Sequence, residues 1–193
     1  MTKLKYFNYG TSFTTDSLHT IYAGAFRQLL ILLFDSSHCH EPWSLFKKIA
    51  QIDDWLALVQ TPSTTQRRFR SLKYISKYKG SEFRCLFHFG SITITQFMND
   101  NSHKTLLLSF VTAINLASAN FITDESIEVV QQLLHYFVEQ FQLIFGMRHM
   151  SSNIHSLLHV HESLKCMGPL WFYSTFSFEG ERQHDENPVH NLF

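Results

Sequence analysis

One stretch decides the fold: Thr123-Asp-Glu-Ser-Ile-Glu-Val-Val-Gln-Gln-Leu-Leu-His-Tyr-Phe-Val-Glu-Gln-Phe-Gln-Leu-Ile-Phe-Gly146. Thr123 suits the N-cap of a helix, and the acidic Asp124 and Glu125 suit the positive end of its dipole. Gly146 suits the C-terminal end, where a positive φ is often required. Apolar side chains recur at helical spacing along one face: Ile127, Val130, Leu134, Phe137, Phe141 and Ile144. We therefore predict a helix over residues 124–145 that packs this face against partner helices.

Further helices are expected on both sides of this one, at residues 18–34, 43–59, 104–119 and 153–166. The helix at 104–119 is apolar around nearly its whole circumference, so we expect it at the centre of the fold. Residues 11–15 have the β-branched and aromatic types of a strand end, whereas 83–97 fit either a buried helix or two short strands. The fold class is therefore mainly α.

Composition describes a globular chain with an aromatic core. Of its 193 residues, 45% are hydrophobic and 17% are charged, and there are 19 Phe. The formal net charge of zero means that any contact with nucleic acid must come from a local patch. The three Cys (39, 85 and 166) are scattered and odd in number, which favours reduced intracellular thiols. The most apolar run, Leu29 to Phe34, is too short to cross a bilayer, so we expect a soluble chain with no membrane partner.

A basic and aromatic stretch at residues 67–84 has the composition of a DNA-backbone contact, because Lys and Arg bind phosphates. Its candidate contact residues are Arg67, Arg68, Arg70, Lys73, Lys77 and Lys79, interleaved with Phe69, Tyr74, Tyr78 and Phe83. The alternative is a solvated charged face that binds nothing. In that case Arg84 and Glu82 are expected to pair within the helical part of the chain.

Two histidines, His155 and His159, share a helix face because they are four residues apart, and this spacing suits zinc ligands. Further ligands for a structural Zn²⁺ would come from His38, Cys39 and His40. The alternative is that both rings pack under the Gly168-Pro169 loop and form hydrogen bonds with the backbone. The sequence leaves both interpretations open.

Three motif segments occur in order along the chain. The first is Asp16-Ser-Leu-His19, followed by Gly24 and Arg27-Gln-Leu-Leu30, and the second is Lys79-Gly-Ser-Glu-Phe-Arg84. The third runs Asn153-Ile-His-Ser-Leu-Leu-His159, then Gly168-Pro-Leu170, then Ser174, Phe176 and Phe178-Glu179. Over roughly residues 11–180 they resemble the transposases of the CACTA and related cut-and-paste elements. The matching patterns are D-x-x-H, W-K-A-T-E-F-R and N-x-H-x-L-x-H … G-P-L … S-x-F-x-F-E. The spacing from His159 to Glu179 also resembles that of the V(D)J recombinase, where a His pair at a similar place helps bind a structural zinc.

The resemblance implies an RNase H-like α/β fold in which three acidic residues hold two divalent cations, expected to be Mg²⁺. The second acid corresponds to Asp16 and the third to Glu179. It also implies DNA as the partner, a nuclear location for a functional protein, and leaves a homo-oligomer open for the full-length protein. The expected domains are a remnant of the RNase H-like core at 1–35, a helical insertion at 36–150, a terminal block with the acidic motif at 151–180, and a disordered tail at 181–193.

One acid of the resembled site is missing. The family's first Asp lies far upstream of the D-x-x-H motif, whereas only fifteen residues precede Asp16 and none of them is acidic. The chain is therefore expected to be a fragment of a catalytic domain that does not cut or join DNA by itself. If the resemblance holds, the carboxylates of Asp16 and Glu179 share one cleft.

Two alternatives remain for these acids. Asp16 suits the N-cap of the helix that follows it, and Glu179 taken alone is an ordinary surface residue. The matching functional alternative is a helical protein-interaction or DNA-binding module that derives from a transposable element and has no catalytic activity.

Overall fold

The computed structural model describes residues 16–62 and 69–175, and every regular element within them is a helix. A mainly α fold is therefore confirmed. The strand end predicted at residues 11–15 and the tail predicted at 181–193 lie outside the described residues. The RNase H-like part of the fold and the domain boundaries stay predictions.

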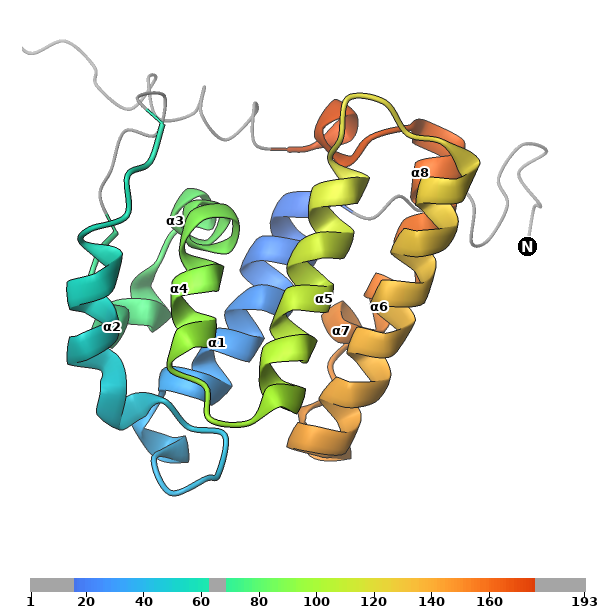
Figure 1. Cartoon of the computed structure of the whole chain (residues 1–193). Coiled ribbons are helices and arrows are strands. Elements are labelled where there is room, and N and C mark those ends of the chain that lie inside the picture. The colour runs from blue at the N-terminus through green and yellow to red at the C-terminus, as the bar shows by residue number, and fades with distance from the viewer. Residues whose placement is uncertain (1–15, 63–68, 176–193) are drawn as a thin grey trace, which may run out of the picture.

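The α-helices pack side by side in one bundle (Figure 1). They are α1 (Arg27–Phe34), α2 (Ile49–Leu56), α3 (Gly80–Cys85), α4 (Ser91–Gln96), α5 (Asn101–Ala117), α6 (Asp124–Phe145), α7 (Ser152–Ser156) and α8 (Val160–Met167). Two wider π-type helices connect to them: η1 (Ser17–Phe26) leads into α1, and η5 (Leu86–Gly90) joins α3 to α4. Shorter 3₁₀ turns are η2 (Ser36–His38), η3 (Phe46–Lys48), η4 (Leu72–Lys77), η6 (Met147–His149), η7 (Leu157–His159) and η8 (Leu170–Tyr173).

Helix α6 has the bounds that the sequence predicts, and its caps explain why. The Thr123 hydroxyl accepts a bond from the Ser126 backbone N–H at 3.2 Å, and the Ser126 hydroxyl accepts one from the Thr123 N–H at 2.9 Å. Gly146 ends the helix with a φ of 85°, a conformation that suits glycine. Helix α5 runs beside α6, and Phe110 of α5 stacks on Phe137 of α6 with ring centroids 4.4 Å apart (Figure 1).

Three other helices differ from their predicted bounds. The helix expected at 104–119 is α5, which begins at Asn101 and ends at Ala117. The helix expected at 43–59 begins only at η3, because the Leu45 N–H donates to the Leu33 carbonyl at 2.7 Å and so ties residue 45 to the end of α1. The helix ends at Leu56. The helix expected at 153–166 is divided by the 3₁₀ turn η7 into α7 and α8. Residues 83–97, which the sequence left undecided, are helical.

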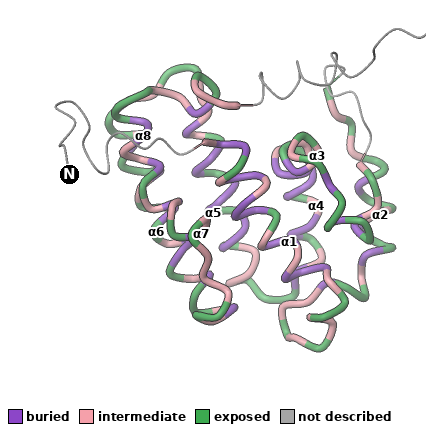
Figure 2. Tube along the Cα trace, turned by 180° about the vertical axis from the view of Figure 1, so that it is seen from behind, coloured by how far each residue is buried: buried purple, intermediate pink, exposed green. Residues whose placement is uncertain are grey.

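One hydrophobic core extends from Ile21 to Leu170 and includes side chains from every α-helix. Buried positions dominate α1 and α5, whereas α2 and α6 also carry many exposed positions (Figure 2). The continuous helix Ser17–Phe34 is long and apolar enough to cross a membrane by length and composition, but 67% of it is buried inside the protein. That burial is typical of a core helix in a globular fold.

Candidate functional site

Asp16 is the N-cap of η1, as its local sequence predicts. Its carboxylate accepts hydrogen bonds from the backbone N–H of Leu18 at 3.4 Å and of His19 at 3.0 Å. The Nδ1 atom of the His19 ring lies 2.5 Å from the same carboxylate. The Asp and the His of the D-x-x-H motif are therefore direct partners.

The same carboxylate connects the first motif segment to the last one. Thr175 donates to it through its backbone N–H at 3.2 Å and through its hydroxyl at 3.0 Å. Beside this contact, the Ser17 hydroxyl donates to the Ser174 hydroxyl at 2.9 Å. Residues from the two ends of the described chain thus meet at the start of η1.

These bonds determine the charge state of Asp16. Partial burial acts to raise the pKa of the carboxyl group, but the hydrogen bonds from His19 and Thr175 outweigh it, so the pKa lies below its usual value of 3.8. Asp16 is therefore an anion across the neutral pH range.

The three motif segments pack against one another through two glycines. A Cβ atom on Gly24 would lie 2.7 Å from the Asn153 side chain, and one on Gly80 would lie 2.3 Å from Leu18 Cδ1. Both contacts are closer than real Cβ atoms allow, so each position needs glycine or a local shift. The first segment, which contains Leu18 and Gly24, therefore lies directly against the second and the third.

A pocket of about 430 Å³ opens beside this junction. It is lined by Ser17, Tyr22, Arg84, His88, Ser118, Leu170, Trp171 and Ser174. These residues come from η1, α3, η5, η8 and the loop after α5, so the pocket exists only in the folded chain.

A chain of hydrogen bonds forms one wall of the pocket. Tyr22 Oη lies 2.8 Å from His88 Nε2, and His88 Nδ1 lies 2.8 Å from Asn115 Oδ1. With an amide oxygen as its partner, Nδ1 carries the proton, so Nε2 accepts the bond that the Tyr22 hydroxyl donates. Burial lowers the pKa of His88, and the positive charge of Arg84 lowers it further. Burial raises the pKa of Tyr22 to about 12. Both side chains are therefore neutral at physiological pH.

The basic stretch contains both a structural arginine and exposed lysines. Arg70 donates to Glu82 at 3.0 Å and lies over the Tyr78 ring at 5.0 Å, so Glu82 pairs with Arg70 and not with Arg84 as predicted. The cause is the loop before α3, which brings residue 70 next to the start of that helix. Lys73, Lys77 and Lys79 are exposed and available to phosphates, whereas Arg67 and Arg68 lie outside the described residues.

His155 and His159 lie side by side, with ring centroids 5.7 Å apart, and His159 Nδ1 is 3.4 Å from Glu162. Both residues are exposed, so the alternative in which they pack under the Gly168-Pro169 loop is wrong. The core is occupied instead by the apolar side chains of the same segment. His38, which was a further candidate zinc ligand, instead packs its ring on that of His149, with ring centroids 5.6 Å apart.

Within residues 16–62 and 69–175, no three His, Cys, Asp or Glu side chains gather in a way that would hold a metal ion. A zinc at the His155 and His159 pair therefore needs a ligand from outside those ranges and stays a prediction.

Glu179, the other predicted acid, lies outside the described residues. Several residues around Asp16 were not identified from the sequence, among them Thr175, Tyr22, His88 and Asn115. Thr175 directly follows Ser174 of the third motif segment, and this position in the sequence could have identified it. His88 and Asn115 meet only through the tertiary packing of η5 on α5, and no local pattern indicates such a contact.

Comparison with known proteins gives no match to a family model, to a curated protein or to a solved structure. The resemblance to cut-and-paste transposases is therefore a hypothesis that depends on the three motif segments and on the geometry they form.

Proposed function

We propose that this chain is part of a transposase-like catalytic domain, of the type that cleaves and joins DNA strands with two Mg²⁺ ions, and that it is inactive by itself. The proposal takes Asp16 as the second acid of the site and Glu179 as the third. DNA is the substrate, and the helices between the two acids are the insertion that separates them in the sequence.

The bonds between Asp16 and Thr175 are the observation that carries the proposal. Glu179 follows Thr175 by four residues, and four extended residues span at most about 14 Å. A residue bonded to Asp16 is therefore only four positions from Glu179 along the chain, although Asp16 and Glu179 themselves are 163 positions apart (179 − 16).

The packing of the motif segments supports the same proposal. Gly24 lies against Asn153, and both of these positions match the resembled patterns. Gly80 lies against Leu18 and so brings the second segment against the first, although Gly80 stands where the pattern has Ala and Leu18 is at an unspecified position of D-x-x-H. A chance match along the sequence gives no reason for such contacts.

The residues around Asp16 fit a complete two-metal site poorly. Such a site needs several hard oxygen ligands that converge on two ions roughly 4 Å apart. The described residues offer Asp16 as the carboxylate at this junction, and its oxygens already accept bonds from His19 and Thr175. A metal ion must displace one of those donors. For this reason we derive no cleavage step from these residues and expect the chain alone to be inactive.

The second candidate is a helical module that binds protein or DNA without catalysis. The bonds that saturate the Asp16 carboxylate favour it, because a carboxylate that serves as an N-cap and holds Thr175 already has a complete structural role.

Calorimetric titration of the chain with Mn²⁺ separates the two candidates. We expect weak binding that Asp16→Asn and Glu179→Gln each abolish. Asp35→Asn is the matched control, because the Asp35 carboxylate also caps a helical turn, accepting the Ser37 N–H at 2.8 Å, and no role at the site is proposed for it. Equal binding by the wild type and the three variants would refute the metal site and support the non-catalytic module.

Activity is tested separately by incubating the chain with a supercoiled plasmid and Mg²⁺ or Mn²⁺. We expect no nicking. Nicking that Glu179→Gln removes would show that another acid has replaced the missing one, and the inactivity would be refuted.

A further inference from the structure

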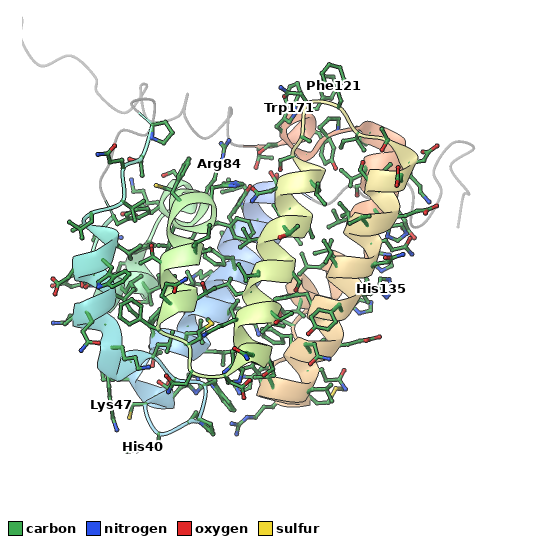
Figure 3. All side chains as sticks on the ribbon, in the orientation of Figure 1. His40, Lys47, Arg84, Phe121, His135 and Trp171 are labelled. Atoms are coloured by element: carbon green, nitrogen blue, oxygen red, sulfur yellow. The ribbon has the colours of Figure 1, made fainter. Side chains whose placement is uncertain are left out.

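The pocket beside Asp16 lies at one end of the molecule. Arg84 and Trp171, which both line it, are seen at this end together with Phe121, whereas His40 and Lys47 lie at the opposite end (Figure 3). Its volume of about 430 Å³ is within the usual range of small-ligand pockets, roughly 300–1,000 Å³.

The charge of the pocket favours an anion. Arg84 is the cation among the lining residues that the structure describes, and none of those residues is acidic. Burial is the main cause of the raised pKa of Tyr22 and of the lowered pKa of His88, and the nearby positive charge of Arg84 acts to lower both. The wall also contains the Ser118 hydroxyl and the hydroxyls of Ser17 and Ser174, which bond each other at 2.9 Å. A guanidinium with nearby hydroxyls suits a phosphate group.

The other end of the pocket is aromatic. Trp171 is 52% exposed although the neighbouring Leu170 is only 1% exposed, so the indole ring stands at the surface while its neighbour fixes the turn to the core. Phe172 is also 70% exposed in the same turn. A large exposed indole offers a flat face on which another ring stacks. The pocket therefore joins a phosphate-binding group to a ring-stacking group.

We propose that this pocket binds one unpaired nucleotide of a DNA strand, with its phosphate on Arg84 and its base on Trp171. The nucleotide must be unpaired because a base inside a duplex has both faces covered by its neighbours. The inference rests on the proposed function for the choice of DNA. It places the bound nucleotide next to Asp16, because Ser17, which lines the pocket, directly follows Asp16 in the chain. It requires no metal ion.

Fluorescence anisotropy with a labelled single-stranded octanucleotide tests this proposal, in buffer that contains EDTA. Stacking on an aromatic side chain contributes roughly 1–3 kcal/mol per base, so Trp171→Ala is expected to weaken binding by about tenfold or more. Trp171→Phe keeps a flat ring and is expected to retain most of the affinity. Trp55→Ala is the matched control, because Trp55 is 54% exposed but lies on α2 and contacts Phe97.

The phosphate contact is tested through the dependence of binding on salt. Removing one phosphate contact is expected to reduce the slope of log K against log salt concentration by about 0.7 for a single strand. Arg84→Gln is expected to show this decrease, whereas the control Lys47→Gln, at the opposite end, keeps the wild-type slope. Arg84 is exposed and Glu82 pairs with Arg70, so Arg84→Gln leaves the Arg70–Glu82 ion pair intact.

Three further ligands identify what the pocket recognises. A blunt duplex of the same sequence is expected to bind without any effect of Trp171→Ala, and free deoxyadenosine monophosphate to compete more strongly than inorganic phosphate. Equal effects of Trp171→Ala on duplex and single strand would overturn the proposal, as would wild-type affinity in both Trp171→Ala and Arg84→Gln. Because no metal is present, a failure here is distinct from a failure of the Mn²⁺ titration.

Discussion

Truncating Phe137 to Ala tests whether the stripe along α6 holds the fold together. The Phe137 side chain is fully buried and lies between two other rings, with centroids 4.4 Å from Phe110 and 5.7 Å from Phe141. The change removes an entire ring from the contact between α5 and α6 and leaves a cavity, because a close-packed core relaxes only in part.

The expected loss follows from this geometry. Phe→Ala changes at buried sites cost about 3–5 kcal/mol, and the aromatic pairs account for roughly 0.5–1.5 kcal/mol of interaction each. Full burial and contacts on two sides place Phe137 towards the upper part of that range. Ala has the higher helix propensity, and this gain offsets only about half a kcal/mol.

Guanidinium unfolding followed by circular dichroism measures the free energy of unfolding for the wild type and the variant. Leu143→Ala is the matched control, because Leu143 lies on the same helix but is 74% exposed. It should change the stability by less than about 0.5 kcal/mol. A loss below about 1 kcal/mol for Phe137→Ala, or equal losses in the two variants, would show that the stripe is not the core of this fold.

Three other substitutions test the junction around Asp16, each by the same unfolding measurement. Gly24→Ala should cost about 1–2 kcal/mol net, because its new Cβ lies 2.5 Å from the His19 carbonyl oxygen and 2.7 Å from the Asn153 side chain, and overpacking outweighs the gain in helix propensity; unchanged stability would contradict the close packing. Tyr22→Phe should cost about 0.5–1.5 kcal/mol because it removes the hydrogen bond to the half-buried His88 Nε2, and a stability equal to that of the wild type would exclude this bond. The pKa of Asp16 is lowered in the folded state, so its stabilising contribution is complete above the unfolded value near 3.8 and is lost as the pH falls through the folded value. Asp16→Asn should therefore show a smaller loss of stability than the wild type on acidification below about pH 4, and equal slopes would refute the shift.

Sequence patterns predicted those helices whose ends are set by local groups. The bounds of α6 follow from Thr123 and Gly146, which act within one turn of the helix. The start of α2 did not follow from its sequence, because the bond from Leu45 to Leu33 depends on how the chain returns to α1. Hydrophobic periodicity therefore indicated which segments are helical, whereas tertiary contacts determined where some of them begin.

The same distinction applies to the candidate site. The N-cap role of Asp16 was predictable because its partners, Leu18 and His19, are two and three residues away. Its bonds to Thr175 join positions 159 residues apart, and no periodic pattern carries information over that distance. Glu82 was predicted to pair with Arg84 but pairs with Arg70, because composition does not show which arginine lies next to the start of α3.

The two candidate functions differ in what competes for the oxygens of Asp16. A carboxylate offers about four acceptor sites, and here His19 and Thr175 occupy both oxygens. Capping bonds of this kind contribute only roughly 0.5–2 kcal/mol, so a divalent cation displaces them readily when a second carboxylate converges on the same ion. With Asp16 alone, the bonds to Thr175 persist and the segment stays attached to η1. Under the proposed function, metal binding and release of Thr175 are therefore one equilibrium, which a second carboxylate ligand such as Glu179 would shift towards the metal-bound state.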